Sequence, residues 1–517
     1  MARARRTNQN KTTARQLGSI IKSARDIMRK DKGLSGDLDR LPMLTWIMFL
    51  KFLDDMERLH EDEALLAGEP FRPIIEPPYR WRDWAADAGG ITGDELMAFV
   101  NQDEAVRPNG SRGPGLLAYL RGLQPTDGDP RPGVVATVFG GVINRMINGY
   151  LLRDVINKVH DINFAASGQI HTLSHLYETM LREMRDAAGD SGEFYTPRPV
   201  VKLMVAVTDP HLGEVVLDPA CGTGGFLVEA YKHLAAQCRT VAGRRTLQEA
   251  SIRGGEAKPL PYLLGQMNLL LHGLESPAIA FGNSLATPLR EIGDRQRVDV
   301  ILTNPPFGGE EEPGIQNNFP QDKRTSETAL LFLQLIMRKL RRLPRPGRAA
   351  MVVPNGTLFA GGVAARIKSE LLTAFNLHTI VRLPNGVFAP YTSIPTNLLF
   401  FDRSGPTKEI WCYEHPLPEG RKNYTKTRPL RYAEFEPLLA WWDDREENEQ
   451  AWKVAAKEVL KYDDAGNILS VNLDLKNPSS GDPFEHVPPE ELVVGILEKE
   501  RQILELMIEL QEALRND

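Results

Sequence analysis

From about residue 166 onward, short apolar runs alternate with longer segments whose apolar residues recur at helical spacing. Strands that alternate with helices build a sheet that is covered on both faces, so an α/β unit is predicted. Because no helical pattern separates the last two runs, we expect them to form an antiparallel hairpin at one edge of the sheet. The apolar runs are Glu214 to Leu217, Val298 to Leu302, Ala349 to Val353, Thr379 to Leu383 and Asn397 to Phe401.

The rest of the chain has a different pattern of apolar residues. Its 517 residues exceed one ordinary core of about 100 to 200 residues, so two or three units are expected. Residues 1–165 are predicted to be a helical N-terminal unit, because apolar residues recur at helical spacing from about Thr13 to His60. The α/β unit then spans 166–477. Residues 478–517 are predicted to be a linker and a final helix, Glu490 to Arg515, whose apolar seam suits a partner helix.

Composition excludes several classes of protein. The apolar fraction of 42% and the charged fraction of 25% are those of a soluble globular chain, not a disordered or membrane-embedded one. With a net charge of -6, nucleic-acid binding requires a local basic face or a charged partner. Three cysteines without a C-x-x-C pair favour a reducing cytoplasm. The most apolar stretch, Leu44 to Leu53, is interrupted by Lys51, and the N-terminus has no apolar signal region, so neither membrane spanning nor export is predicted.

The first segment that indicates a ligand-binding site runs from Glu214 to Glu229. It has the pattern of a buried strand, a glycine-rich turn and a helix. Glycines at 222, 224 and 225 lack the Cβ atoms that would keep a ligand off the backbone. Asp218 is expected at the carboxyl end of the strand, where open α/β sheets bind ligands. The spacing is neither that of a dinucleotide nor that of an NTP loop, so a nucleoside without phosphates fits better. A tight turn that only packing requires is the alternative.

The second segment, Asp299 to Gly308, has the pattern of a strand that ends in Asn304, Pro305, Pro306 and Phe307. The two prolines fix φ and remove two backbone donors, which predicts a rigid loop that presents carbonyl oxygens. The Asn304 side-chain oxygen and the Pro305 carbonyl are then able to accept hydrogens from one amino group, and Phe307 offers a flat face to a ring. This turn therefore predicts a site for the exocyclic amine of a planar heterocycle.

Together and in this order, Asp218-Pro-Ala-Cys-Gly-Thr-Gly-Gly-Phe and Asn304-Pro-Pro-Phe resemble the motifs of S-adenosylmethionine-dependent N6-adenine DNA methyltransferases. The wider chain resembles the modification subunit, HsdM, of type I restriction-modification systems. Further matching segments are Gly192 to Arg198, Gln266 to Gly273 and Val353 to Gly356, so the resemblance covers nearly all of the chain. It implies a Rossmann-like methyltransferase sheet as the catalytic domain, an all-helical N-terminal domain and a C-terminal helical tail.

The resemblance also implies an activity, the transfer of a methyl group from S-adenosyl-L-methionine to a flipped adenine in DNA. No metal is implied, because the sulfonium leaving group departs neutral. The implied catalytic residues are Asn304, Pro305, Pro306 and Phe307. The implied cofactor-binding residues are Glu193, Phe194, Tyr195, Thr196, Pro197, Arg198, Asp218, Gly222, Thr223, Gly224, Gly225, Glu256 and Asn283.

Within that set, the resemblance assigns Asp218 and Thr223 to Gly225 to the methionine part of the cofactor, Glu256 to the ribose hydroxyls and Asn283 to the adenine. Two departures from the expected pattern concern the last two residues. The interval from Asp218 to Glu256 is longer than the roughly 20 residues of a dinucleotide unit. Position 283 holds Asn where Asp is expected, although an amide is also able to pair with an adenine edge.

The partners that the resemblance implies are double-stranded DNA, a specificity subunit, a second copy of the modification subunit and, in the larger complex, a restriction subunit. Membrane association is not implied. Two alternatives stay open: a glutamine methyltransferase that acts on a protein, since these enzymes also use an Asn-Pro-Pro turn, and a non-catalytic scaffold that binds the cofactor.

Three other features of the sequence have no definite functional interpretation. Phe388 or Tyr391 is expected either to add a second face for the flipped base or to fill a loop. His171 and His175 lie four residues apart, but no third metal ligand accompanies them. The run of three glutamates from Glu310 to Glu312 follows the catalytic turn, where it would repel phosphates, and the sequence offers no explanation for it.

Overall fold

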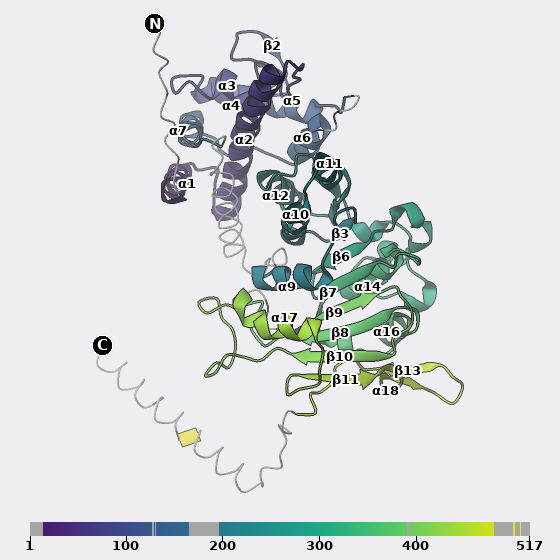
Figure 1. Cartoon of the computed structure of the whole chain (residues 1–517). Coiled ribbons are helices and arrows are strands. Elements are labelled where there is room, and N and C mark those ends of the chain that lie inside the picture. Colours follow the sequence, from purple (N-terminus) through teal and green to yellow (C-terminus); the bar gives the residue numbers. More distant parts are fainter. Residues whose placement is uncertain are drawn as a thin grey trace.

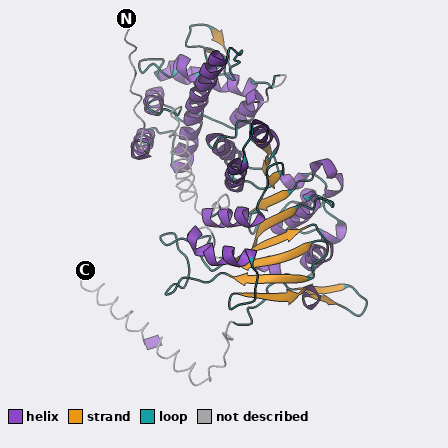
Figure 2. Ribbon diagram, viewed as in Figure 1, coloured by secondary structure: helices purple, strands orange, loops and turns teal. Residues whose placement is uncertain are grey.

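The computed structural model describes residues 14–126, 129, 131–164, 196–389, 392, 394–479, 500, 501 and 507. It contains a helical unit and an α/β unit built on one large twisted sheet (Figures 1 and 2). Most of the predicted final helix, together with His171 and His175, lies outside the described residues. Among the helices that the structure describes, none has both the length and the apolar character needed to cross a bilayer.

The N-terminal unit is built from helices around an apolar core, as its spacing predicts. The predicted core positions of its longest helix, Leu41, Leu44, Ile47, Met48 and Phe52, are all buried. Its helices are α1 (Ala14–Met28), α2 (Asp37–Ala67), α3 (Trp81–Trp84), α4 (Gly93–Asn101), α5 (Leu116–Gly122), α6 (Arg131–Gly140) and α7 (Gly149–His160). One excursion forms a two-stranded antiparallel ribbon, β1 (Ala105–Val106) with β2 (Arg112–Gly113).

The α/β unit is organised by a nine-stranded sheet with the strand order β11-β10-β8-β9-β7-β6-β3-β4-β5. The pairs from β5 to β7 are parallel, β9 is antiparallel to both of its neighbours, and β11 is antiparallel to β10. The strands are β3 (Val216–Asp218), β4 (Ile252–Glu256), β5 (Ala278–Phe281), β6 (Val300–Thr303), β7 (Arg348–Pro354), β8 (Asn376–Arg382), β9 (Thr396–Asp402), β10 (Glu409–Glu414) and β11 (Ala451–Ala455).

Helices cover both faces of this sheet, as the alternation of short strands and helices predicts (Figure 1). Along β6, Val300 and Leu302 join the core on one face and Ile301 joins the core on the other, because successive side chains of a strand point to opposite sides. One face carries α9 (Arg198–Thr208), α10 (Gly225–Gln237) and α17 (Glu436–Asp443), and the other carries α14 (Thr328–Lys339), α15 (Asn355–Phe359) and α16 (Val363–Ala374).

Shorter elements complete the unit. Helix α11 (Val241–Ala250) packs on α10 and β4. A second ribbon, β12 (Leu460–Tyr462) with β13 (Ile468–Val471), is antiparallel and packs on α16. The remaining helical elements are η2 (Ser284–Ala286), η3 (Leu289–Glu291), η4 (Asp294–Gln296), α13 (Pro313–Gln316), η5 (Gln321–Lys323), η6 (Tyr432–Phe435) and α18 (Ala456–Val459).

The last two predicted strands pair as expected, but their predicted position is wrong. Strands β8 and β9 are antiparallel and no helix separates them. They do not form an edge, because β10 pairs with β8 in parallel and β11 then extends the sheet further. The prediction missed β10, which follows β9 after a short loop, and β11, which follows a longer connection that contains η6 and α17.

Helix α12 (Pro259–Leu271) belongs to two cores at once. Its residues Leu263, Leu264 and Met267 pack into the core of the N-terminal helical unit, whereas Tyr262 and Leu269 pack into a core of the sheet. A helix that is apolar on all sides is buried on all sides. The two units are therefore joined through a shared helix and not only by a linker.

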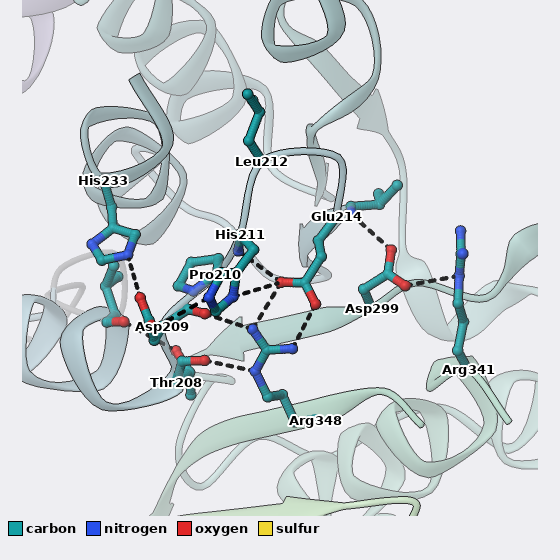
Figure 3. Close-up of polar contacts among 12 residues, drawn as sticks. Thr208, Asp209, Pro210, His211, Leu212, Glu214, His233, Asp299, Arg341 and Arg348 are labelled. Carbon is teal, nitrogen blue, oxygen red and sulfur yellow. Dashed lines mark hydrogen bonds and ion pairs between the residues drawn. The ribbon is translucent and has the colours of Figure 1, made fainter. Parts of the chain in front are cut away.

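At the amino ends of the central strands, Arg348 of β7 holds the last turn of α9 in place (Figure 3). Its guanidinium group donates to the Thr208 and Asp209 carbonyl oxygens at 2.6 and 2.7 Å and to both carboxylate oxygens of Glu214 at 2.8 Å. These contacts satisfy carbonyl groups that a helix end otherwise leaves without partners. They tie α9, which carries Arg198 at its other end, to the sheet.

Candidate active site

The two turns predicted from the sequence lie next to each other at the carboxyl edge of the sheet. Strands β3 and β6 are adjacent and parallel, with Leu217 opposite Ile301, so the turns that follow them leave the sheet side by side. A direct contact joins them, because the Thr303 hydroxyl group donates to Asp218 Oδ1 at 2.7 Å. A ligand that contacts both turns is thus geometrically allowed.

The glycine turn adopts a conformation that favours glycine. Gly222 has φ of 52° and Gly224 has φ of 77°, and both values lie in the left-handed region. Gly224 is the N-cap of α10, so the first backbone N–H groups of that helix face the turn. Glu256 stabilises the turn, because its Oε2 accepts a hydrogen bond from Gly222 N at 2.9 Å.

Two adjoining cavities open at these turns, which we name the Asp218 pocket and the Glu256 pocket. They share Ala220, Gly222 and Asn304. The predicted residues that line the Asp218 pocket are Thr196, Arg198, Asp218, Gly222, Thr223, Gly225 and Asn304. The predicted residues that line the Glu256 pocket are Gly222, Glu256, Asn283, Asn304 and Pro306. Both turns therefore contribute to both cavities.

Two buried carboxyl groups shape the electrostatics of these cavities. Burial raises the pKa of Asp218 to about 7, although the hydrogen bonds from the Thr303 hydroxyl and the Ala220 backbone N–H act to lower it. Burial also raises the pKa of Glu256, whose Oε1 accepts from Lys258 N at 2.8 Å. Both groups are fixed by hydrogen bonds, and each has further acceptor capacity for a ligand.

Asn304 is the residue that joins the two pockets, and its amide is only half satisfied. Its Nδ2 donates to the Thr196 hydroxyl oxygen at 3.0 Å, which fixes the side-chain orientation. Its Oδ1 is buried and has no hydrogen-bond partner among the residues that the structure describes. A buried acceptor without a partner costs about 1 to 3 kcal/mol, so this oxygen is suited to receive a donor from a ligand.

The aromatic ring of the Asn304–Phe307 turn packs against a second ring. Phe307 is half-buried and packs against Phe388, with ring centroids 5.9 Å apart and an edge-to-face arrangement. Phe388 itself is 5% exposed, so it fills the loop and supports Phe307 and does not present a second free face. Tyr391, the other residue considered for that role, lies outside the described residues.

The remaining predicted residues fall into three groups. Pro197 is the N-cap of α9, and Arg198 joins that helix to α10 by donating from Nη1 to the Gly225 carbonyl oxygen at 3.0 Å. Pro305 is buried beside Asn304. Glu193, Phe194 and Tyr195 lie outside the described residues.

Asn283 lies in the Glu256 pocket with its amide already engaged by the protein. Its Oδ1 accepts from Leu285 N at 2.9 Å and caps η2, and its Nδ2 donates to Glu311 Oε2 at 3.2 Å. Glu311 also lines this pocket and was not predicted as a site residue. The only signal in the sequence was the unexplained run of glutamates after the catalytic turn.

Comparisons with known proteins identify the family of the chain. The family described as N-6 DNA Methylase matches residues 168–473, and the family described as HsdM N-terminal domain matches residues 17–108. The chain is 47% identical over 508 residues to the Type I restriction enzyme EcoEI methylase subunit of Escherichia coli, covering 96% of this chain and 97% of that protein.

Two solved structures are similar over nearly the whole length. One is described as a modification subunit of a type I restriction enzyme from Vibrio vulnificus YJ016, with 68% identity, a TM-score of 0.87 and coverage of 93% of this chain and 100% of that one. The other comes from work on complex assembly and conformational transition of the type I R-M system, with 42% identity, a TM-score of 0.75 and coverage of 98% and 100%.

Proposed function

The chain belongs to the N-6 DNA methylase family and, within it, to the methylase subunits of type I restriction enzymes, and from this premise we propose that it transfers a methyl group from S-adenosyl-L-methionine to N6 of adenine in double-stranded DNA. The observation that carries the proposal is the buried Oδ1 of Asn304, which lies between two pockets and has no partner in the described part of the chain. Such an acceptor takes an N–H or O–H donor, and the N6 amine of adenine supplies one.

The two pockets suit the two ends of the cofactor. In the Asp218 pocket, Arg198 and the N-terminus of the 13-residue helix α10 favour the carboxylate of the methionine part. In the Glu256 pocket, the Glu256 carboxylate is an acceptor for ribose hydroxyl groups. When bound, S-adenosyl-L-methionine supplies an electrophilic methyl group on a sulfonium that leaves as a neutral thioether, so no general acid is required.

Asn304 and Pro305 orient the nucleophile. The lone pair of the adenine amine is delocalised into the purine, and acceptance of its two hydrogens by Asn304 Oδ1 and the Pro305 carbonyl favours a tetrahedral nitrogen. Orientation of this kind recovers about 7 to 11 kcal/mol of a reaction barrier. Once the new nitrogen–carbon bond has formed, the amine nitrogen is cationic and loses one proton to solvent water. Phe388 packs edge-to-face against Phe307. This contact holds the Phe307 ring in place for stacking on the base.

The target base has to leave the duplex before Asn304 is able to reach it. Flipping costs a few kcal/mol, and stacking on an aromatic side chain returns about 1 to 3 kcal/mol per base. Phe307 therefore offsets a large part of the cost, and other contacts to DNA supply the rest. With a net charge of -6, this chain depends on a partner for much of its attraction to DNA.

We assign that partner role to a specificity subunit, with a second copy of this chain and a restriction subunit in the larger complex. The support is the naming of the relatives as methylase and modification subunits of type I enzymes, and a similar chain in a structure of type I complex assembly. A DNA substrate and three free cysteines both fit the cytoplasm as the location.

The substitution Asn304→Ala tests the proposal in the complex assembled with the specificity subunit. We expect cofactor affinity within about threefold of the wild type, because the amide is assigned to the substrate amine. Adenine methylation should fall by at least about 100-fold, because an orienting acceptor is lost. Isothermal titration measures cofactor binding, and transfer of a labelled methyl group to DNA measures activity.

Asn467→Ala is the matched control, because Asn467 is an exposed asparagine in the β12–β13 turn, remote from the two pockets. It should leave both measurements unchanged. Retained methylation by the Asn304→Ala complex would refute the role given to this amide. Labelling of a protein and not of DNA by the wild-type complex would refute the substrate.

A further inference from the structure

Glu311 enters the Glu256 pocket from the loop that follows the catalytic turn. Its Oε2 accepts from Asn283 Nδ2 at 3.2 Å, and both residues line the cavity with Glu256. The contact joins two segments that lie 28 residues apart in the sequence. It places a carboxylate beside the position where the expected aspartate is replaced by an asparagine.

The backbone holds Glu311 in this place. Its N–H donates to the Ser326 carbonyl oxygen at 2.8 Å, and its own carbonyl oxygen accepts from Gln316 Nε2 at 2.7 Å. The neighbouring side chains of Glu310 and Glu312 are exposed and do not line the pocket, whereas Glu311 is half-buried. The conformation of the loop therefore directs Glu311, and neither of its two glutamate neighbours, towards the cavity.

The chemistry of the pocket suits a nucleoside that presents hydrogen-bond donors at two separate points. Glu256 and Glu311 are both acceptors, and their two carboxylates outnumber the one lysine of the lining, Lys258, which disfavours a phosphate. Pro306 and Phe332 supply apolar surface to the same cavity, which fits a planar ring. Adenosine meets both requirements, with ribose hydroxyls at one end and a 6-amino group at the other.

We propose that Glu311 accepts a hydrogen bond from the 6-amino group of the cofactor's adenine, and that Asn283 holds the Glu311 carboxylate in position for this contact. The inference rests on the proposed function, because it takes S-adenosyl-L-methionine as the ligand of the pocket. It explains the asparagine at position 283. An aspartate there would place a second carboxylate about 3 Å from Glu311.

The test compares binding of S-adenosyl-L-homocysteine with its analogue in which hydrogen replaces the 6-amino group, by isothermal titration to the full-length protein. The wild type should prefer the amino compound by roughly 10- to 100-fold, the range for a hydrogen bond to a charged group. Glu311→Ala should remove most of this preference. The matched controls Glu310→Gln and Glu312→Gln should retain it.

Exchange of the two side chains gives a second test of the same contact. Asn283→Asp should weaken binding of S-adenosyl-L-homocysteine by about tenfold or more, because it sets two carboxylates against each other. Asn283→Asp combined with Glu311→Gln should restore most of the affinity, because one amide and one carboxylate again form a pair.

The outcomes separate the possible failures. If Glu311→Ala lowers the melting temperature but keeps the preference for the amino compound, Glu311 is structural and the inference is overturned. If Asn283→Asp binds as tightly as the wild type, the charge argument is overturned. If the wild type binds neither compound, the proposed cofactor is wrong, and the role of Glu311 is overturned with it. If the wild type binds both compounds equally, only the role of Glu311 is overturned.

Discussion

The Asp218 carboxyl group is 1% exposed at the end of β3, and its burial has a consequence for stability. Burial raises its pKa from 3.8 to about 7 in the folded protein, so it stays protonated there while the unfolded chain ionises. The unfolded state then binds fewer protons than the folded state between about pH 4 and pH 7. For this group, stability is fully present below pH 4 and declines as the pH rises towards 7.

Asp218→Asn is therefore expected to stabilise the protein at neutral pH. The amide oxygen keeps the acceptor role toward the Thr303 hydroxyl and the Ala220 backbone N–H, and the group no longer ionises. The melting temperature should exceed that of the wild type by a few degrees at pH 8 and match it near pH 4. Calorimetry across this pH range, with exposed Asp464→Asn as the control, measures the difference; a pH-independent difference would contradict the assignment.

The Asn304–Phe307 turn could be located from the sequence because one short motif contains all of its residues. The partner of Asn304 could not, because Thr196 lies 108 residues away in the sequence and only the fold brings the two together. Glu311 was visible as part of an acidic run, but the choice of one glutamate among three depends on backbone hydrogen bonds that no spacing encodes. The position of each turn was thus predictable from local sequence, and pairing across the fold was not.

At the scale of secondary-structure elements, Arg348 joins β7 to the end of α9 at the amino edge of the sheet (Figure 3). Burial acts to raise the pKa of Glu214, but the hydrogen bonds from Arg348 and from the His211 backbone N–H lower it overall. The stabilising ion pair is present above the ordinary pKa of glutamate and is lost as the pH falls through the lowered value.

Arg348→Ala should destabilise the protein by about 1 to 3 kcal/mol, because it leaves the last carbonyl groups of α9 and the Glu214 carboxylate without their donor. Since α9 carries Arg198 into the Asp218 pocket, cofactor affinity should also fall. Chemical denaturation and isothermal titration measure the two effects. The exposed Arg345→Ala is the control, and equal stability of the two variants would contradict this role.

Whether a strand was predicted depended on how apolar its sequence is. Strands β6, β7 and β9 read as apolar runs because both of their faces are covered. Strand β4 was missed as a strand, because its sequence, Ile252 to Glu256, contains two glycines and an arginine. Strand β5 was missed because three of its four residues are exposed at the sheet edge. Edge strands lack the apolar pattern on which prediction depends.

At the scale of the whole molecule, the shared helix α12 makes the stability of the helical unit depend on the sheet. Leu264 is 4% exposed and packs in the core of the helical unit, although it belongs to the α/β unit in sequence. Leu264→Ala should cost about 2 to 5 kcal/mol and speed hydrogen exchange of the α2 amides, measured by mass spectrometry.

Leu234→Ala in α10 is the matched control, because Leu234 is fully buried in a core of the sheet that contains no residue of α2. It should cost a similar free energy and leave exchange in α2 largely as in the wild type. If both variants speed exchange in α2 equally, the two cores unfold as one unit, and α12 has no special role in joining them.

The same helix also reaches the glycine turn. Asn268 Nδ2 donates to the Thr223 carbonyl oxygen at 2.8 Å, and a Cβ atom on Gly265 would lie 3.0 Å from the Gly222 carbonyl oxygen. A rotation of the helical unit that carries α12 with it must therefore either move the glycine turn, which lines both pockets, or break that hydrogen bond. A partner that shifts the helical unit would thereby also shift the glycine turn.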